Sequence, residues 1–256
     1  MANPILLLRL EGPLQSWGIR SRWDVRDTST EPTKSGVVGL LGCALGYGVG
    51  DERLRTELDA GLTFGVRVEN AGRVVRDYHT VTDFLPTAKG SFKHGGGTGS
   101  SLQRLLESDE AEPATIVSQR FYLEDAAFLV ALREADSHPG LVHRCAAALQ
   151  DPVWPIYLGR KACVPTRPVF DAVSDLYPSL EEALRAYPWS WLSAANKLRS
   201  FPVHALHGYV EDRDGPLTRQ DAVHLNAVRS YGFRSVRQIS DIKEPLPAGD
   251  TKGAGA

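Results

Sequence analysis

The order of strand-like and helix-like segments over the first 170 residues constrains the fold of this chain more than any other feature. Residues 5–10 are a compact apolar run that ends at a Gly-Pro pair, which predicts a buried first strand. Apolar residues recur at helical spacing through residues 35–46 and again through 139–150, which predicts two core helices. We expect the first helix to begin near Ser35, because serine is a favoured N-cap residue.

Strand-like segments fill the interval between these helices. Residues 62–69 and 73–81 alternate between apolar and polar side chains, and we expect the Asn-Ala-Gly sequence at 70–72 to join them as a hairpin. Further strands are predicted at residues 115–123 and 126–133. This order resembles the split βαβ arrangement, so we expect an α+β fold with a ferredoxin-like (RRM-like) domain over residues 1–170.

Residues 82–113 interrupt the pattern. They are rich in glycine and serine and hold few apolar side chains. Such a segment has too little apolar surface to form a packed core of its own. We therefore expect an extended arm that needs a partner to order it.

The chain beyond residue 170 is less regular. A short helix is predicted at 180–187, and strands are predicted at 203–211 and 228–239. We expect residues 171–243 to form a small C-terminal β-rich region. Residues 244–256 are small and polar, which is typical of a flexible tail.

Composition limits the kinds of partner. The 29 Lys and Arg residues are balanced by 31 Asp and Glu residues, so any contact with nucleic acid has to be local. Cys43, Cys145 and Cys163 lie far apart in sequence and form no CxxC pair, which argues against a disulfide framework and against a zinc site. No apolar stretch is long enough for a transmembrane helix, and the N-terminus lacks the features of a signal peptide. We expect a soluble, cytoplasmic protein with no membrane partner.

Nucleotide, cofactor and metal motifs are missing from the sequence. There is no GxxxxGK[ST], GxGxxG, HExxH or GxSxG motif, so we expect no cofactor, no bound metal and no catalytic role. Metal-free RNA cleavage stays open as an alternative, because Tyr78-His79 and Lys93-His94 are suitable acid and base types. However, the Lys93-His94 pair adjoins a run of three glycines, which is a poor place to hold catalytic groups.

Three segments interleave cations with aromatic residues, as single-stranded RNA-binding proteins do. The first holds Trp17, Arg20, Arg22, Trp23, Arg26 and Lys34; the second Tyr157, Arg160, Lys161 and Arg167; the third Arg229, Tyr231, Phe233, Arg234 and Arg237. An ordinary solvated surface with half-buried aromatic residues, as on a protein–protein scaffold, has the same composition. These patterns by themselves favour neither interpretation.

Five segments resemble the Cas-five family of CRISPR-associated proteins, in its subtype I-E branch. They are LRLEGPLQSWG (8–18), PTKSGVVGLLGCALG (32–46), RDYHTV (76–81), FYLEDAAFLVAL (121–132) and YLGRKACVP (157–165). The resemblance covers residues 5–170 well and the remainder loosely.

The resemblance implies a ferredoxin-like domain with a long β-hairpin thumb at about residues 82–116. It implies a non-catalytic subunit of a Cascade surveillance complex in antiviral defence, which caps the complex and holds the 5′ handle of the CRISPR RNA. Its partners would be that RNA, the CasC backbone subunit, the large CasA subunit and other Cascade subunits. Relatives of subtype I-C cleave precursor CRISPR RNA, so a metal-independent endoribonuclease is the alternative function.

The resemblance also suggests which residues meet RNA. Gly36, Gly39 and Gly42 would let RNA or a neighbouring backbone approach the first helix, with Ser35 beside them, while Lys34 would neutralise a phosphate. Tyr157 would stack on a base, and Arg160 and Lys161 would fix the path of the handle. Weaker candidates are Arg20, Arg22 and Arg26. The thumb is unusually long and rich in glycine, so no thumb contact is transferred to this chain.

Overall fold

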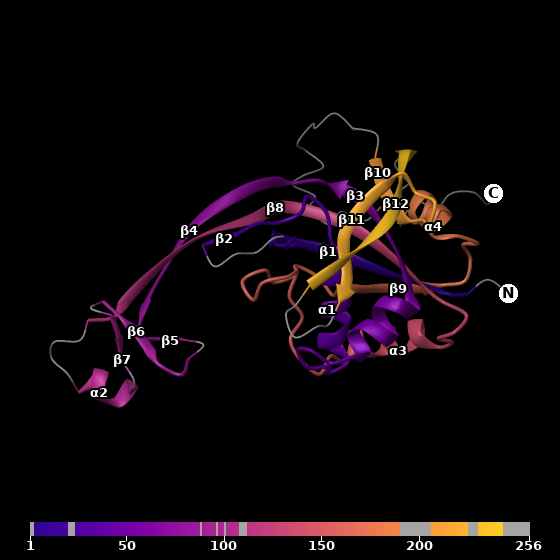
Figure 1. Ribbon diagram of the computed structural model, residues 1–256. Coiled ribbons are helices and arrows are strands. Elements are labelled where there is room, and N and C mark those ends of the chain that lie inside the picture. The colour runs from indigo at the N-terminus through magenta and orange to yellow at the C-terminus, as the bar shows by residue number, and fades with distance from the viewer. Residues whose placement is uncertain are drawn as a thin grey trace.

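The computed structural model describes residues 3–19, 24–87, 89–95, 97–99, 101–107, 112–189, 206–224 and 230–242. Within these residues, one nine-stranded sheet forms the body and continues into a long two-stranded ribbon that projects from it (Figure 1). A second, three-stranded sheet lies at the far end of the ribbon. Among the described residues, no helix combines the length and the apolar character that crossing a membrane requires.

Four antiparallel strands form the centre of the body. They are β1 (Ile5–Gln15), β3 (Leu62–Asn70), β8 (Ala114–Glu134) and β9 (Phe170–Ser174), in the order β3-β8-β1-β9. The helices α1 (Lys34–Ala44) and α3 (Leu141–Gln150) connect them and cover one face, with the short π-helix η1 (Leu54–Asp59) between α1 and β3. Alternate side chains of β1, including Leu6 and Leu8, pack in that core. A mixed α/β fold is therefore confirmed.

The C-terminal strands continue the same sheet. The strands β10 (Leu206–Glu211), β11 (Leu217–His224) and β12 (Ser230–Ile242) extend it beyond β3, with β10 hydrogen-bonded to β3. The helix α4 (Leu180–Ala186) packs on the face opposite α1 and α3. Parts of the strands predicted at 203–211 and 228–239, and the tail at 244–256, lie outside the described residues.

The predicted hairpin at residues 70–72 is wrong. The strand β4 (Arg73–Asp83) continues in the direction of β3, and both pair with β8: Asn70 lies opposite Ala127, and Arg73 lies opposite Glu124. The two intervening residues, Ala71 and Gly72, form an irregularity, stabilised by a hydrogen bond from the Asn70 side chain to the carbonyl of Asp125. A turn-forming sequence here bends a strand without reversing it.

We call the projecting part, residues 73–124, the thumb. Its ribbon is β4 paired with the first half of β8, so it starts nearer the body than the predicted thumb at about 82–116. Its tip holds the strands β5 (Leu85–Pro86), β6 (Phe92–His94) and β7 (Gly97–Gly99) and the helix α2 (Leu102–Leu106). The short strand β2 (Val25–Arg26) pairs with β8 near the base of the thumb.

The expectation that residues 82–113 lack packing of their own is also wrong. Leu105 of α2 is 9% exposed, and a Cβ atom built on Gly99 would lie 2.9 Å from its side chain. The glycine that argued against a core therefore allows the helix to pack closely on the small sheet. One buried leucine on three short strands is still a small core.

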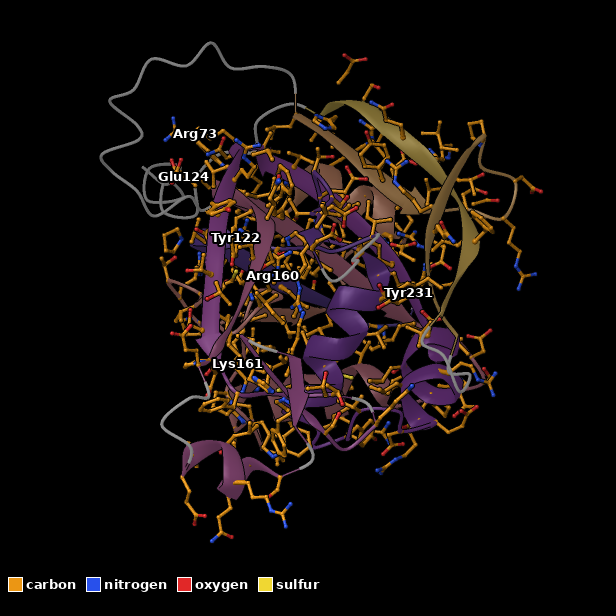
Figure 2. The ribbon with its side chains drawn as sticks, turned by 60° about the vertical axis from the view of Figure 1, so that its left-hand side comes forward. Arg73, Tyr122, Glu124, Arg160, Lys161 and Tyr231 are labelled. Atoms are coloured by element: carbon orange, nitrogen blue, oxygen red, sulfur yellow. The ribbon has the colours of Figure 1, made fainter. Side chains whose placement is uncertain are left out.

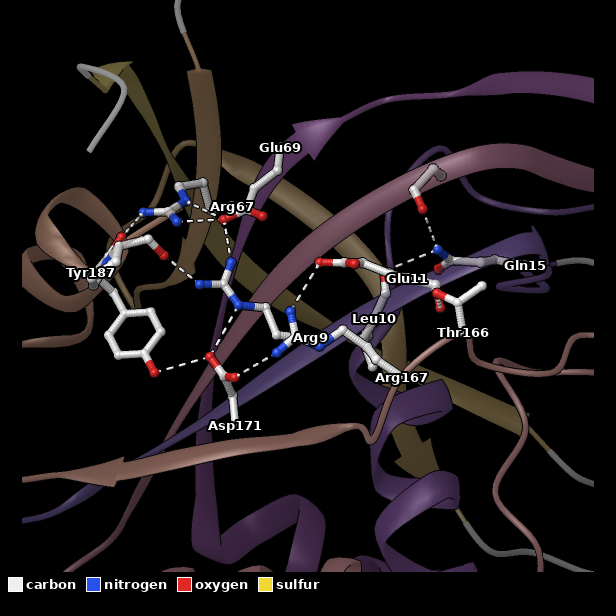
Figure 3. Close-up of polar contacts among 12 residues, drawn as sticks. Arg9, Leu10, Glu11, Gln15, Arg67, Glu69, Thr166, Arg167, Asp171 and Tyr187 are labelled. Atoms are coloured by element: carbon white, nitrogen blue, oxygen red, sulfur yellow. Dashed lines mark hydrogen bonds and ion pairs between the residues drawn. The ribbon is translucent and has the colours of Figure 1, made fainter. Parts of the chain in front are cut away.

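Six charged side chains pair with one another on the α4 face of the main sheet, and we call them the buried ion network (Figure 3). Four of them are buried, and Arg167 and Asp171 are half-buried. The network consists of Arg9, Glu11, Arg67, Glu69, Arg167 and Asp171. Arg9 Nη1 lies 2.6 Å from Glu69 Oε1, and Arg9 Nε lies 3.1 Å from Asp171 Oδ2. Three arginines and three carboxyl groups thus pair with one another on this face of the sheet.

The network ties the segment after α4 to the sheet. Arg67 Nη1 donates to the carbonyl oxygens of Leu184 at 2.7 Å and Tyr187 at 2.8 Å. The Tyr187 hydroxyl donates to Asp171 at 2.9 Å. Burial raises the pKa of Glu11 to about 7, although Arg167 at 3.7 Å opposes this shift.

Candidate nucleic-acid interface

A cleft of about 910 Å³ crosses the helix α1 between the base of the thumb and the C-terminal strands. Its floor is formed by α1, with Ser35, Gly36 and Gly39. One wall is the end of β1 with the loop around Tyr157, and the other is formed by β11 and β12. Arg160 and Tyr231 mark these two walls (Figure 2).

The charge of the cleft has one sign. Among the described residues that line it, the ionised side chains are Arg26 and Arg160, and no carboxylate lines it. Tyr157 and Tyr231 are half-buried and present aromatic rings to the same space. Cations with accessible aromatic rings suit a single-stranded polyanion with planar bases.

The glycines of α1 differ in what surrounds them. A Cβ atom on Gly36 would lie 2.8 Å from the ring of Trp17, and one on Gly42 would lie 2.3 Å from Leu54, so both allow close packing within the chain. A Cβ atom on Gly39 would have no neighbour within 4 Å among the described residues. Glycine in a helix costs about 1 kcal/mol relative to alanine. Internal packing explains Gly36 and Gly42 but gives no reason for Gly39, which faces the cleft.

Lys34 lies away from the cleft lining, and it is 5% exposed. Its Nζ atom lies 3.0 Å from Glu211 Oε2, and its backbone N–H donates to Asp221 Oδ2 at 2.7 Å. The helix N-cap is Thr33, not Ser35, since the Thr33 hydroxyl accepts from Gly36 N. The charge of Lys34 is therefore already neutralised, and we leave Lys34 out of the interface that we propose below.

The three predicted RNA-binding residues of the loop at 157–161 lie in different environments. Arg160 is half-buried, and its guanidinium donates to the backbone carbonyls of Phe121, Arg26 and Asp27. Tyr157 lines the cleft, while Lys161 is exposed and is absent from the described cleft lining. Arg26 lines the cleft too, and its side chain has no carboxylate partner among the described residues.

Other predicted cations have partners within the chain. Arg167 pairs with Asp171, Arg234 with Asp221, and Arg237 with Asp212 and Glu181. Arg20, Arg22, Trp23 and Arg229 lie outside the described residues. Of the third aromatic and basic segment, Tyr231 lines the cleft, whereas Phe233 is 72% exposed and is not part of the lining.

Sequence reasoning missed the contribution of β11. Gln220 and Val223 of this strand line the cleft, but no strand was predicted at residues 217–224. The segment LTRQDAVH has only a weak alternation of apolar and polar residues. Its Asp221 is buried against Arg234, so the usual polar-out pattern of a strand is broken.

Comparison with known proteins adds independent information. A family model described as "CRISPR-associated protein (Cas_Cas5)" matches residues 5–237. The "CRISPR system Cascade subunit CasD" of Escherichia coli (strain K12) is 34% identical over 173 residues, which cover 64% of this chain and 69% of that protein.

Two solved structures are also similar. One, titled "Crystal structure of Cas protein", is 33% identical with a TM-score of 0.64, and the match covers 96% of this chain and 98% of that one. The other, titled "CRISPR RNA-guided surveillance complex", is 30% identical with a TM-score of 0.61, over 95% of this chain and 91% of that one. The family match spans nearly the whole described body and the thumb, and the chain belongs to the CRISPR-associated Cas5 family.

Proposed function

We propose that this chain is an RNA-binding subunit of a Cascade ribonucleoprotein complex and that the cleft over α1 holds CRISPR RNA. The observation that carries this proposal is the cleft lining, whose described residues include two arginines and two accessible tyrosines but no carboxylate. A relative that is itself a Cascade subunit, and a similar chain from an RNA-guided surveillance complex, support it.

The resemblance of the sequence motifs extends the proposal. The bound segment is the 5′ handle of the CRISPR RNA, and the subunit caps the complex beside the CasC backbone subunit and the large CasA subunit. The fold assigned to the body is ferredoxin-like. Its support is the chain order β1-α1-β3-β8-α3-β9, together with the sheet order β3-β8-β1-β9.

The proposed contacts have distinct roles. Arg26 pairs with phosphate, since no carboxylate competes for it among the described residues. Tyr157 stacks on a base, and Lys161 adds a mobile charge from the adjoining exposed loop. Ser35, Gly36 and Gly39 form the floor, where the open space above Gly39 brings the helix backbone within reach of the RNA.

We propose no catalytic role. The described residues that line the cleft include no histidine and no carboxylate, so the cleft itself offers no general base of these types. His79 lies on the thumb ribbon, 3.5 Å from Asp77, and His94 belongs to the thumb tip. Labelled repeat RNA incubated with the protein should stay intact in EDTA and in magnesium. Single-site cleavage that disappears in His79→Ala would favour the endoribonuclease instead.

A glycine pair gives a matched test of the binding site. Gly39→Leu places a side chain in the cleft, whereas Gly48→Leu makes the same change at an exposed glycine that also has no neighbour within 4 Å and lies outside the cleft lining. We expect Gly39→Leu to abolish binding of repeat-derived RNA and Gly48→Leu to preserve it, with both proteins folded by circular dichroism. Equal affinities for the two variants would place the RNA elsewhere.

A further inference from the structure

The base of the thumb is the place where β8 changes partners. The pairing of β8 with β1 ends at Leu123, opposite Gln15, and its pairing with β2 begins at Arg120 and Gln119. Phe121 lies in the interval between these partners. On the other edge, the β3–β4 irregularity faces Asp125, which has a positive φ of 57°. A ribbon that leaves a sheet through such a junction needs other contacts to fix its direction.

Arg160 supplies such contacts. Its Nη1 atom donates to the carbonyl oxygen of Phe121 at 2.8 Å. Its Nη2 atom donates to the carbonyl oxygens of Arg26 at 2.9 Å and Asp27 at 3.1 Å. The guanidinium also stacks over the ring of Tyr122, with Cζ 4.7 Å from the ring centroid. One side chain thus joins the thumb strand to the segment that carries Arg26. Figure 2 shows Arg160 beside Tyr122.

The loop that carries Arg160 is itself firmly held. Leu158 N donates to Cys163 O at 2.8 Å, and Ser16 N donates to Leu158 O at 3.0 Å. A Cβ atom on Gly159, whose φ is +101°, would lie 1.9 Å from the carbonyl oxygen of Ser16, so the two backbones are in direct contact. Arg160 therefore extends from a rigid base fixed to the end of β1.

The hydrogen bonds of Arg160 indicate that its guanidinium has a structural role. No carboxylate pairs with Arg160 in the part of the chain that the structure describes, and its charge is compensated by three carbonyl dipoles. A planar guanidinium can bridge separate carbonyls, whereas the ammonium of lysine is a compact point charge on a flexible stem. An arginine at position 160 can therefore make this bridge, whereas a lysine with the same charge cannot.

We propose that Arg160 is a positioning residue that locks the base of the thumb to the Arg26 segment and so fixes one wall of the cleft before RNA arrives. The role in RNA binding rests on the proposed function, while the locking of the thumb does not. Preorganised walls reduce the ordering cost of binding, so loosening this contact weakens binding without removing a phosphate contact.

The first measurement is the distance between the thumb tip and the body in the absence of RNA. Spin labels on Thr98→Cys at the thumb tip and Asp175→Cys in the body, in a Cys43→Ser background, report the distance between the two parts. We expect a narrow distance distribution for the parent protein and for Lys161→Gln, and a broad one for Arg160→Lys and Arg160→Gln. Narrow distributions in both Arg160 variants would overturn the proposal.

RNA affinity supplies the second measurement, on the same proteins without labels. Arg160→Lys should bind repeat RNA about tenfold more weakly, because a lysine cannot remake the hydrogen bonds to the three carbonyls. The dependence of the affinity on salt should stay unchanged. Wild-type affinity in Arg160→Lys would mean that Arg160 acts through its charge and would overturn the positioning role. If the parent protein binds no RNA, the proposed function fails, and the distance measurement still decides the thumb contact. Arg160→Lys keeps the charge and the aliphatic stem, so it is the variant to use if Arg160→Gln does not fold.

Discussion

The buried ion network and the cleft are two arginine-rich regions on opposite faces of one sheet, and their arginines serve different ends. In the network, Arg9 and Arg67 are almost fully buried and face Glu69 at ion-pair distance. In the cleft, Arg26 and Arg160 have no carboxylate beside them within the described residues. Neutralised arginines hold segments of the protein together, whereas arginines without carboxylate partners remain available to a polyanion or to backbone carbonyls.

The largest effect should follow from removing a network arginine. Arg67→Met leaves the buried Glu69 with Arg9 as its remaining cation and removes the bonds to the carbonyls of Leu184 and Tyr187. Breaking a buried ion pair on one side costs about 3–5 kcal/mol of unfolding free energy. Urea denaturation measures this loss.

The matched change in the cleft is Arg26→Met, which should alter stability by less than about 0.5 kcal/mol because no ion pair is broken. RNA affinity should respond in the reverse order, with Arg26→Met weakened and folded Arg67→Met unaffected. Equal losses of stability in the two variants would remove the distinction between the regions.

The second effect concerns pH. Burial raises the pKa of Glu11 from its ordinary value of 4.5 to about 7. The folded protein therefore holds a proton that the unfolded chain releases, so this group destabilises the fold as pH rises from about 4.5 to about 7. Glu11→Gln should flatten that part of the profile and stabilise the protein at pH 8 by about 2–3 kcal/mol.

Thermal unfolding of Glu11→Gln and of the parent protein across pH 4–8 measures this effect. Glu107→Gln, at an exposed position in the thumb, is the control and should follow the parent curve. A Glu11→Gln protein that is less stable than the parent at pH 8 would show that the carboxylate form is the one the network needs.

The third effect is confined to the cleft. Tyr157→Ala should weaken RNA binding by about 1–3 kcal/mol if the ring stacks on a base, and the slope of affinity against salt should stay unchanged. Arg26→Gln should lower the magnitude of that slope by about 1, as expected for one lost phosphate contact. Fluorescence anisotropy at several salt concentrations separates the two results. A Tyr157→Ala protein that melts earlier but keeps its affinity would make Tyr157 a packing residue.

The smallest effect is expected at Gly39, where one added methyl group should raise the stability of α1 and lower the affinity for RNA. Gly39→Ala adds a methyl group where no atom of the described residues lies within 4 Å, so α1 should gain about 0.5–1 kcal/mol of stability. If RNA approaches the helix backbone there, affinity should fall at the same time. Gly48→Ala, at a glycine outside the cleft lining, is the control for affinity. Gly39→Ala with unchanged RNA binding would show that the floor of the cleft is not in contact.

The sequence alone determined the elements with strong local patterns. The run at residues 5–10 became part of β1, and the predicted helices at 35–46 and 139–150 became α1 and α3 within a few residues. Helical and strand periodicity arise from contacts between near neighbours in sequence, so they can be predicted before the tertiary structure is known. The motifs that resemble the Cas-five family are also short local segments of the sequence, and the family match over residues 5–237 confirmed that family.

The tertiary structure decided everything that depends on distant partners. Lys34 is neutralised by Glu211, and Arg9 by Asp171, across more than 150 residues in each case. Nothing near Lys34 or Arg26 in the sequence distinguishes the paired cation from the one in the cleft. Residues 70–72 have the composition of a turn, but hydrogen bonding to β8 keeps the chain extended on both sides. Charge pairing and strand register depend on which segments the fold brings together, because both act through contacts across space.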